Sequence, residues 1–238
     1  MCGRFQFVPK SSSVFLEWGL EDSEELQVME ELLAERYNIA PTQEVAVVRL
    51  RSNSDPEDGR MLEGMRWGLV PPWATEGRSA AGFINARVET AAEKPTFRDP
   101  WKDHRCLIPA TGYYEWAKKG GPPTLVQRES GRPMTFAGLW TPSREGHASS
   151  CTILTMAAGE GLSQLHHRMP VLLRREEQGE WLAAGGLPFE IGNAPVVPFP
   201  VSTVVVSKRL NKVQEQGASL MEPDPEPPSP PEQLDLFG

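Results

Sequence analysis

The chain alternates short β-prone segments with turn-forming residues, and this spacing most limits the folds open to it. Nine segments of three to seven residues are rich in apolar and β-branched side chains, and Gly, Pro, Asn and Ser cluster between them. Many short strands with few helices predict an α+β domain around a curved antiparallel sheet. The predicted strands are Val45–Leu50, Met61–Trp67, Cys106–Pro109, Tyr113–Trp116, Thr124–Arg128, Met134–Trp140, Cys151–Met156, Val171–Leu173 and Val201–Val206, with a turn at Asn53–Gly59.

Three segments have the pattern of peripheral helices. Ser11–Ser13 predicts an N-cap before a helix over Val14–Leu20, with Glu17 in its first turn. Leu and Met recur at helical spacing within Glu24–Arg36, and Glu176–Ala184 reads as a surface helix. With no internal repeat, we expect residues 1–220 to form one compact domain.

The composition changes at Met221. Residues 222–231 are acidic and rich in proline, so they cannot bury apolar surface and should be extended and disordered. The chain then ends in an apolar cluster, Gln233-Leu234-Asp235-Leu236-Phe237. We therefore divide the chain into a domain of residues 1–220 and a tail of residues 221–238.

The formal net charge of −8 does not exclude a nucleic-acid partner, because the charge is unevenly spread. Residues 222–238 carry five acids and no Lys or Arg, and seven more acids lie between Glu21 and Glu35. Outside these two stretches the chain is mildly basic. A local cationic groove for nucleic acid is compatible with this distribution.

The number and spacing of the cysteines and histidines indicate a protein of a reducing compartment and predict no metal site. Three cysteines (Cys2, Cys106 and Cys151) are few and odd in number, no CxxC or HxxxH spacing occurs, and the adjacent His166-His167 is a poor metal signal. No apolar run approaches the roughly 20 residues that cross a bilayer, and the N-terminus lacks the apolar core of a signal peptide. We expect a cytoplasmic, monomeric protein with no cofactor and no membrane partner.

Cys2 directly follows the initiator methionine. Removal of Met1 would leave a cysteine whose α-amine and thiol lie on adjacent carbons. Such a 1,2-aminothiol condenses with an aldehyde to a Schiff base, and the thiol then closes a thiazolidine ring. The α-amine titrates at about 7.7–8.0, so a fraction is nucleophilic at neutral pH. A cysteine in this position is more often present because it is small than because it is a nucleophile. Its position alone therefore does not assign it a function, and the other segments of the chain must provide the evidence.

Four segments carry unusual combinations of side chains. They are Cys2-Gly3-Arg4-Phe5, Trp67–Trp73 followed by Asn85–Thr90, Gly112-Tyr113-Tyr114-Glu115-Trp116, and His166-His167-Arg168-Met169-Pro170. In these segments and in their order the chain resembles the SOS-response-associated peptidase (SRAP) family. The resemblance runs over residues 2–220 and includes Arg36–Thr42 and Val213–Gly217.

The resemblance implies a fold, a substrate and a reaction. SRAP proteins are compact α+β domains with a pseudo-barrel core, and they bond covalently to abasic sites in single-stranded DNA through the N-terminal cysteine. Their peptidase activity is the auto-cleavage that removes the initiator methionine. The resemblance therefore implies a DNA-repair factor that shields abasic sites as a thiazolidine crosslink, with abasic single-stranded DNA as its partner.

The same resemblance assigns roles to individual residues. Cys2 resembles the nucleophile, Asn85 the residue that positions the cysteine or the opened sugar, Glu115 the acid/base carboxylate, and His166 the active-site histidine. These types suit the chemistry, because a carboxyl among aromatic residues can have a raised pKa and move protons near neutral pH. Histidine can protonate the opening sugar oxygen, and an amide orients reactants without titrating.

DNA binding calls for cations along a groove and for aromatic faces that stack on bases. The resemblance implies that Arg4, Arg87 and Arg168 hold phosphates. The loop from Trp67 to Trp73, stiffened by prolines, is a candidate wedge that stacks on a base or bends the strand. Each of these residues taken singly would more often be structural.

The end of the tail resembles the short peptide by which bacterial replication and repair proteins bind the sliding clamp. Leu234, Leu236 and Phe237 would fill an apolar cleft of the clamp while Gln233 forms a hydrogen bond at its edge. The proline-rich segment would then be a linker that sets how far the clamp-binding peptide reaches from the domain.

Two functions from other classes remain open from the sequence. The first is a thiol peptidase that uses Cys2 on other proteins. The second is a non-covalent reader of modified DNA in which Cys2 is merely structural.

Overall fold

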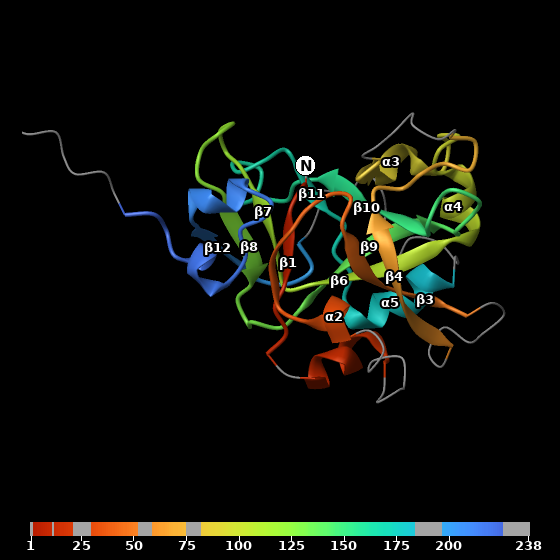
Figure 1. Ribbon diagram of the computed structural model, residues 1–238, viewed down its shortest axis with the longest axis horizontal. Coiled ribbons are helices and arrows are strands. Elements are labelled where there is room, and N and C mark those ends of the chain that lie inside the picture. The colour runs from red at the N-terminus through yellow and green to blue at the C-terminus, as the bar shows by residue number, and fades with distance from the viewer. Residues whose placement is uncertain are drawn as a thin grey trace, which may run out of the picture.

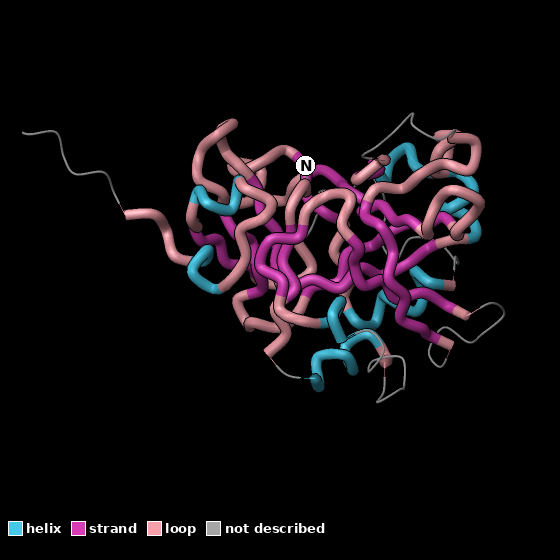
Figure 2. The backbone as a smooth tube through the Cα atoms, in the orientation of Figure 1, coloured by secondary structure: helices cyan, strands magenta, loops and turns pink. Residues whose placement is uncertain are grey.

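Two β-sheets form the body of the protein, and most of the helices lie at their periphery (Figures 1 and 2). The computed structural model describes residues 2–10, 12–20, 30–51, 59–74, 82–183 and 197–225. The smaller sheet has five antiparallel strands in the order β12-β8-β7-β1-β2. Its strands are β1 (Phe5–Phe7), β2 (Arg36–Ile39), β7 (Gly112–Glu115), β8 (Thr124–Arg128) and β12 (Val201–Val205).

The larger sheet closes into a ring. Five of its strands pair in the order β10-β4-β3-β6-β9, and β9 pairs in turn with β10. All its pairings are antiparallel except those of β10 with β4 and with β5. The curved sheet and α+β class expected from the sequence are confirmed. The strands are β3 (Glu44–Leu50), β4 (Arg60–Trp67), β5 (Asn85–Arg87), β6 (Arg105–Ala110), β9 (Met134–Thr141), β10 (Ser150–Ala157) and β11 (Arg168–Pro170).

The first strand, β1, is pinned between the two sheets by aromatic side chains. The Phe5 ring packs edge-on against Trp67 of β4, with centroids 5.1 Å apart, and against Phe136 of β9 at 5.8 Å. All three side chains are fully or almost fully buried. Since burying a large aromatic residue stabilises a fold by several kcal/mol, the start of the chain is held firmly in the core.

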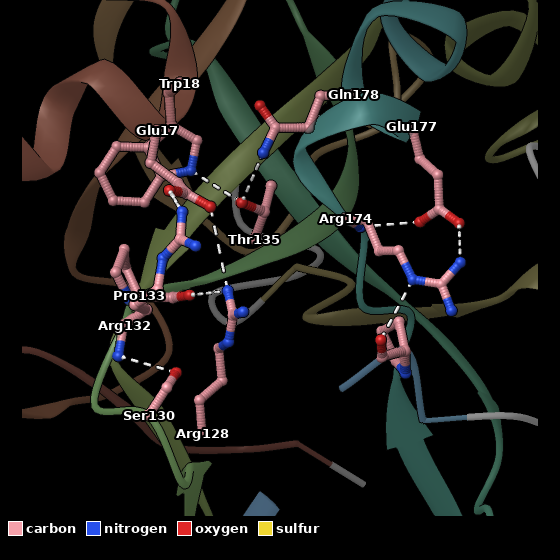
Figure 3. Close-up of polar contacts among 11 residues, drawn as sticks. Glu17, Trp18, Arg128, Ser130, Arg132, Pro133, Thr135, Arg174, Glu177 and Gln178 are labelled. Atoms are coloured by element: carbon pink, nitrogen blue, oxygen red, sulfur yellow. Dashed lines mark hydrogen bonds and ion pairs between the residues drawn. The ribbon is translucent and has the colours of Figure 1, made fainter. Parts of the chain in front are cut away.

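Helical segments cover the outer faces and are joined to the sheets by buried polar contacts (Figure 3). Trp18 and Gln178 both donate to the Thr135 hydroxyl oxygen, at 2.8 and 3.0 Å, and so tie two helices to β9. The Glu177 carboxylate caps α5 by accepting from the Arg174 N–H at 2.7 Å. The helices are η1 (Ser12–Trp18), α2 (Glu30–Leu33), α3 (Val88–Ala91), α4 (Arg98–Asp103), α5 (Arg175–Leu182), η2 (Lys208–Asn211) and η3 (Ala218–Met221).

The predicted strand at Val171–Leu173 is wrong. The strand is β11, and it ends at Pro170, after which the chain changes partners. Val171 donates to Leu154 of β10, whereas Leu173 donates to Thr135 of β9. Because these residues span two strands, they cannot form a continuous ladder with either. The other predicted strands are confirmed, with ends that shift by a residue or two.

The predicted helices need two corrections. The helix expected at Glu24–Arg36 ends at Leu33, because Arg36–Ile39 pairs with β1 as β2. Residues 21–29 lie outside the described part, as does the predicted turn except for Gly59. The segment expected as a helix over Val14–Leu20 is a 3₁₀ helix over Ser12–Trp18, and the helix expected at Glu176–Ala184 is confirmed as α5.

Two residues that we assigned to the tail, Met221 and Asp224, contact the domain of residues 1–220. Met221 packs against the small core around Tyr114, and the Asp224 carboxylate accepts from the Ser207 hydroxyl at 2.5 Å and the Lys208 N–H at 2.9 Å. The apolar end of the tail lies outside the described residues. None of the described helices has the length and hydropathy required to cross a membrane.

Candidate active site and DNA-binding surface

Cys2 is separated from β1 by Gly3 and Arg4 and lies close to the amino end of the chain, which is marked N in Figure 1. The residue is fully buried, and its thiol donates to the Arg4 carbonyl at 3.8 Å. Burial, followed by the charge of Glu115, raises the pKa of this thiol well above its ordinary value. At neutral pH the thiol is therefore protonated.

Glu115 ends β7 beside the amino-terminal segment. The antiparallel register pairs Phe5 with Tyr113, so Glu115 is level with Gly3 and adjacent to Cys2. The Glu115 side chain is almost completely buried, and this burial raises the pKa of its carboxyl to about 7. A carboxyl with that pKa exchanges protons readily at neutral pH, as the aromatic neighbours in the sequence predict.

Asn85 holds the backbone of Cys2 from the opposite side. The residue begins β5, which runs parallel to β10 and pairs Asn85 with Ile153. Its Nδ2 donates to the Cys2 carbonyl at 2.8 Å. Its buried Oδ1 has no hydrogen-bond partner among the described residues. The bond from Nδ2 is compatible with the first of the two roles expected from the sequence, positioning the cysteine, which remains a prediction.

His166 lies in the turn that leads into β11. Its Nδ1 lies 2.9 Å from the Arg168 backbone nitrogen and 3.1 Å from the Arg168 carbonyl oxygen, so the Arg168 backbone holds the ring at this nitrogen. Burial, with the nearby Arg168 cation, lowers the pKa of this imidazole. The ring stacks on the exposed ring of His167, with centroids 4.3 Å apart. A neutral imidazole at pH 7 keeps one N–H donor and one acceptor nitrogen.

The three predicted phosphate-binding arginines differ in their exposure and in their contacts within the protein. Arg87 is exposed at the end of β5. Arg168 forms a bidentate pair with the Glu89 carboxylate at 2.5 and 2.9 Å, and its side chain is only 11% exposed. The guanidinium of Arg4 is bound within the protein to Asn38 and to the Leu210 and Asn211 carbonyls. Arg87 is thus the member of the three best placed to meet a phosphate.

The two tryptophans of the predicted wedge have different environments. Trp67 is fully buried, and its indole N–H donates to the Ile84 carbonyl at 2.9 Å, so it cannot stack on a base and that prediction is corrected. Trp73 is 63% exposed. Its loop is held by Arg144, which donates to the Pro71 and Ala74 carbonyls at 3.0 and 2.8 Å.

Phe83 is an exposed aromatic residue that the sequence did not single out. Its backbone pairs with Leu69 through two hydrogen bonds of 3.1 and 3.0 Å, and the residue is 40% exposed. Its position two residues before Asn85 is the signal that would have indicated it. Within the described residues, no group of His, Cys, Asp or Glu is arranged to hold a metal ion.

The family model described as "SOS response associated peptidase (SRAP)" matches residues 1–213. The chain belongs to the SRAP family. The site described above thus lies in the matched region of this SRAP chain.

Curated relatives cover most of this SRAP chain. It is 32% identical over 231 residues to "Abasic site processing protein YedK" of Escherichia coli, covering 94% of this chain and all of the relative. It is 34% identical over 188 residues to "Abasic site processing protein YoqW" of Bacillus subtilis, covering 76% of this chain and 80% of the relative. A solved protein of Bacteroides thetaiotaomicron has the same fold, with a TM-score of 0.73, 22% identity and coverage of 93% and 99%.

Replacing Glu115 by Gln should stabilise the SRAP domain at alkaline pH. The folded-state pKa of about 7 lies above the ordinary 4.5, so the folded protein holds this proton more tightly, and the resulting stability is lost as pH rises through 7. At pH 8 we expect Glu115→Gln to raise the free energy of unfolding by about 2–3 kcal/mol, with little difference at pH 5. Urea unfolding at both pH values measures this. A variant that is equally stable or less stable at pH 8 would show that the ionised carboxylate costs nothing.

Proposed function

We propose that this protein captures abasic sites in single-stranded DNA through a covalent bond to Cys2, after Met1 has been removed. The observation that carries the proposal is the placement of Cys2 between the Asn85 amide and a buried Glu115 carboxyl with a pKa of about 7. The names of the curated relatives, which describe abasic site processing proteins, support the same substrate.

The first step is condensation with the aldehyde of the ring-opened abasic sugar. The freed α-amine of Cys2 attacks the aldehyde carbon and forms a C–N bond, because the protonated thiol is the weaker nucleophile. The Glu115 carboxylate takes the proton that the amine loses. Its acid form then protonates the departing hydroxyl, so one water leaves and a Schiff base remains. Before the amine attacks, the His166 imidazole donates a hydrogen bond to the ring oxygen of the sugar as the ring opens.

The second step closes the ring. The Cys2 sulfur adds to the imine carbon, and the thiol proton passes to the imine nitrogen, which gives a thiazolidine. The two steps together release one molecule of water and need no oxidant or metal ion. Asn85 holds the Cys2 carbonyl throughout, so the two nucleophilic atoms remain aligned on one carbon.

Removal of Met1 can use the same groups. The Cys2 sulfur attacks the Met1 carbonyl in an N→S shift while Glu115 accepts the thiol proton and returns it to the nitrogen. Water then hydrolyses the thioester and releases methionine, so that one water is consumed. This step is the auto-peptidase activity that we propose for the chain. A thiol peptidase acting on other proteins is disfavoured, since burial keeps the thiol protonated and therefore weakly nucleophilic.

The aldehyde requirement gives a direct test of the proposed function. Purified protein is incubated with an abasic single-stranded oligonucleotide and resolved on a denaturing gel. We expect a slower covalent band, and we expect no band when methoxyamine has capped the aldehyde beforehand. A band that persists on capped DNA would place the bond elsewhere and contradict the proposal.

We also propose that Arg87 and Trp73 form the DNA-binding surface, with Arg87 on a phosphate. Arg87→Glu should weaken non-covalent binding about tenfold at moderate salt and lower the slope of log affinity against log salt by about one. Binding to an oligonucleotide with a tetrahydrofuran abasic analogue, which has no aldehyde, measures this at several salt concentrations. Arg98→Glu, at an exposed arginine of α4, is the matched control. An unchanged slope in Arg87→Glu would exclude the phosphate contact.

We propose that the tail docks on the bacterial sliding clamp through Gln233, Leu234, Leu236 and Phe237. Clamp binding is supported by the apolar cluster that follows the proline-rich linker. Isothermal titration of a peptide of residues 222–238 into the host clamp tests this. We expect saturable heat that a known clamp peptide abolishes, whereas a Leu236→Ala, Phe237→Ala peptide should give none. Absence of heat from the unchanged peptide would contradict clamp binding.

A further inference from the structure

The segment Lys208–Gln216 crosses the strands that carry the candidate site, and we call it the clasp. It begins with η2 and continues to Gln216. Leu210 is fully buried in a small core with Tyr114 of β7. The clasp therefore packs on the outer side of the sheet whose inner side carries Phe5, and its backbone faces β1 and β2.

Arg4, the residue before β1, joins the start of that strand to the clasp. Its Nη1 donates to the Leu210 carbonyl at 2.8 Å and to the Asn38 Oδ1 at 2.6 Å, and its Nη2 donates to the Asn211 carbonyl at 3.4 Å. The backbone carbonyl of the same residue accepts from the Cys2 thiol and from the Tyr114 N–H. One residue thus connects the clasp, β7 and the nucleophile.

Asn38 completes this junction from β2. The residue is fully buried, and its Nδ2 lies 3.2, 2.9 and 3.0 Å from the Leu210, Lys212 and Glu215 carbonyls. Its backbone pairs with the Gln216 side-chain amide, which accepts from the Asn38 N–H at 3.1 Å and donates to the Asn38 carbonyl at 2.9 Å. The oxygen and the nitrogen of the Asn38 side-chain amide both take part in hydrogen bonds. These directional bonds favour one arrangement of the clasp.

The clasp also reaches the strand that carries the acid. The Trp116 indole N–H donates to the Asn211 Oδ1 at 2.9 Å, and Trp116 directly follows Glu115. The clasp therefore contacts residues next to both reacting groups, on the β1 side through Arg4 and on the β7 side through Trp116. These contacts restrain the backbone on either side of the two reacting residues.

We propose that Arg4 and Asn38 are positioning residues that fasten the start of β1 to the clasp and so align Cys2 with Glu115. The inference rests on the proposed function and deepens it. It also gives Arg4 a role other than the phosphate contact predicted from the sequence. Within the described residues the Arg4 guanidinium meets neutral acceptors and no carboxylate, which suits a shape-dependent junction better than a charge-dependent one.

Arg4→Lys separates the two roles, because lysine keeps the charge but cannot contact three acceptors at fixed angles. At saturating abasic DNA we expect the rate of adduct formation to fall about ten- to hundredfold, since misplacement by about 1 Å has effects of this size. Affinity for the tetrahydrofuran analogue and its salt slope should remain within about twofold. A normal rate in Arg4→Lys, or a loss confined to affinity, would overturn the proposal.

Gln216→Ala keeps the test valid if Arg4→Lys proves unstable. It frees the Asn38 backbone without leaving an unpaired charge, and the rate at saturation should again fall while affinity is kept. Arg209→Lys is the matched control, because Arg209 belongs to the clasp but contacts Glu215 and Ser219 and not β1 or β2, so its rate should not change. Wild-type protein that forms no adduct would contradict the proposed function. A wild-type protein that forms the adduct, with a normal rate in Arg4→Lys, or in Gln216→Ala if Arg4→Lys is unstable, would contradict this inference alone.

Discussion

Cys2→Ser is expected to lose the stable adduct almost completely, by about two orders of magnitude or more, while it still forms a Schiff base. Serine keeps the α-amine, so condensation with the aldehyde continues. It lacks the sulfur that closes the thiazolidine ring, so the imine hydrolyses again. Denaturing gels run with and without borohydride measure the two species, because reduction traps only the imine. Because serine lacks the sulfur that we propose for the auto-cleavage, Met1 must be removed from the variant by an aminopeptidase, and intact mass must show that it has left.

The matched control is Cys151→Ala, since Cys151 is also fully buried but lies within β10. This variant should form the adduct at close to the wild-type yield. A stable adduct in Cys2→Ser at the wild-type level would show that ring closure by sulfur is not needed. Loss of the borohydride-trapped species as well, with Met1 gone, would show that the α-amine is not the first nucleophile.

Glu115→Gln is expected to slow adduct formation by about 10²–10⁴-fold, the usual effect of removing a general acid–base group. Glutamine has the same shape, so the substitution removes proton transfer with little change in packing. In the wild-type protein the rate should rise with pH through about 7 as the carboxyl ionises, and the variant should lack this inflection. Rates at saturating abasic DNA between pH 5.5 and 8.5 measure both effects.

Glu63→Gln is the control, because Glu63 of β4 is paired with Arg49 at 2.7 Å on another face of the protein. Its rate and pH profile should match those of the wild type. An unchanged inflection in Glu115→Gln would assign the pH dependence to another group and remove Glu115 from the mechanism.

Local patterns in the sequence were sufficient for much of the fold. The longer strands follow from β-branched and apolar runs, and α5 follows from its polar surface pattern. The three-residue strands β1 and β5 have too few residues for any periodicity, and they exist because distant partners supply their hydrogen bonds. Val171–Leu173 has strand-like residues but bonds to two strands in turn, which only the tertiary arrangement determines.

The candidate site was partly predictable for a related reason. The residue types and the family resemblance indicated Cys2, Asn85 and Glu115, and the structure brings these three together. The sequence could not tell exposed from buried members of one motif, so Trp67 and Trp73 received the same role although one is in the core and the other on the surface. Nor could it show that the predicted phosphate contact Arg4 bonds to carbonyls more than 200 residues away.

The most direct test of the account is the intact mass of the protein after incubation with a single-stranded oligonucleotide that contains one abasic site. We expect a species equal to the protein without Met1, plus the DNA, minus one water, and we expect Cys2→Ala to lack it. The peptide that carries the DNA should begin at Cys2. Protein and DNA that keep their separate masses, with Met1 fully removed and the aldehyde intact, would contradict covalent capture and favour a non-covalent reader of damaged DNA.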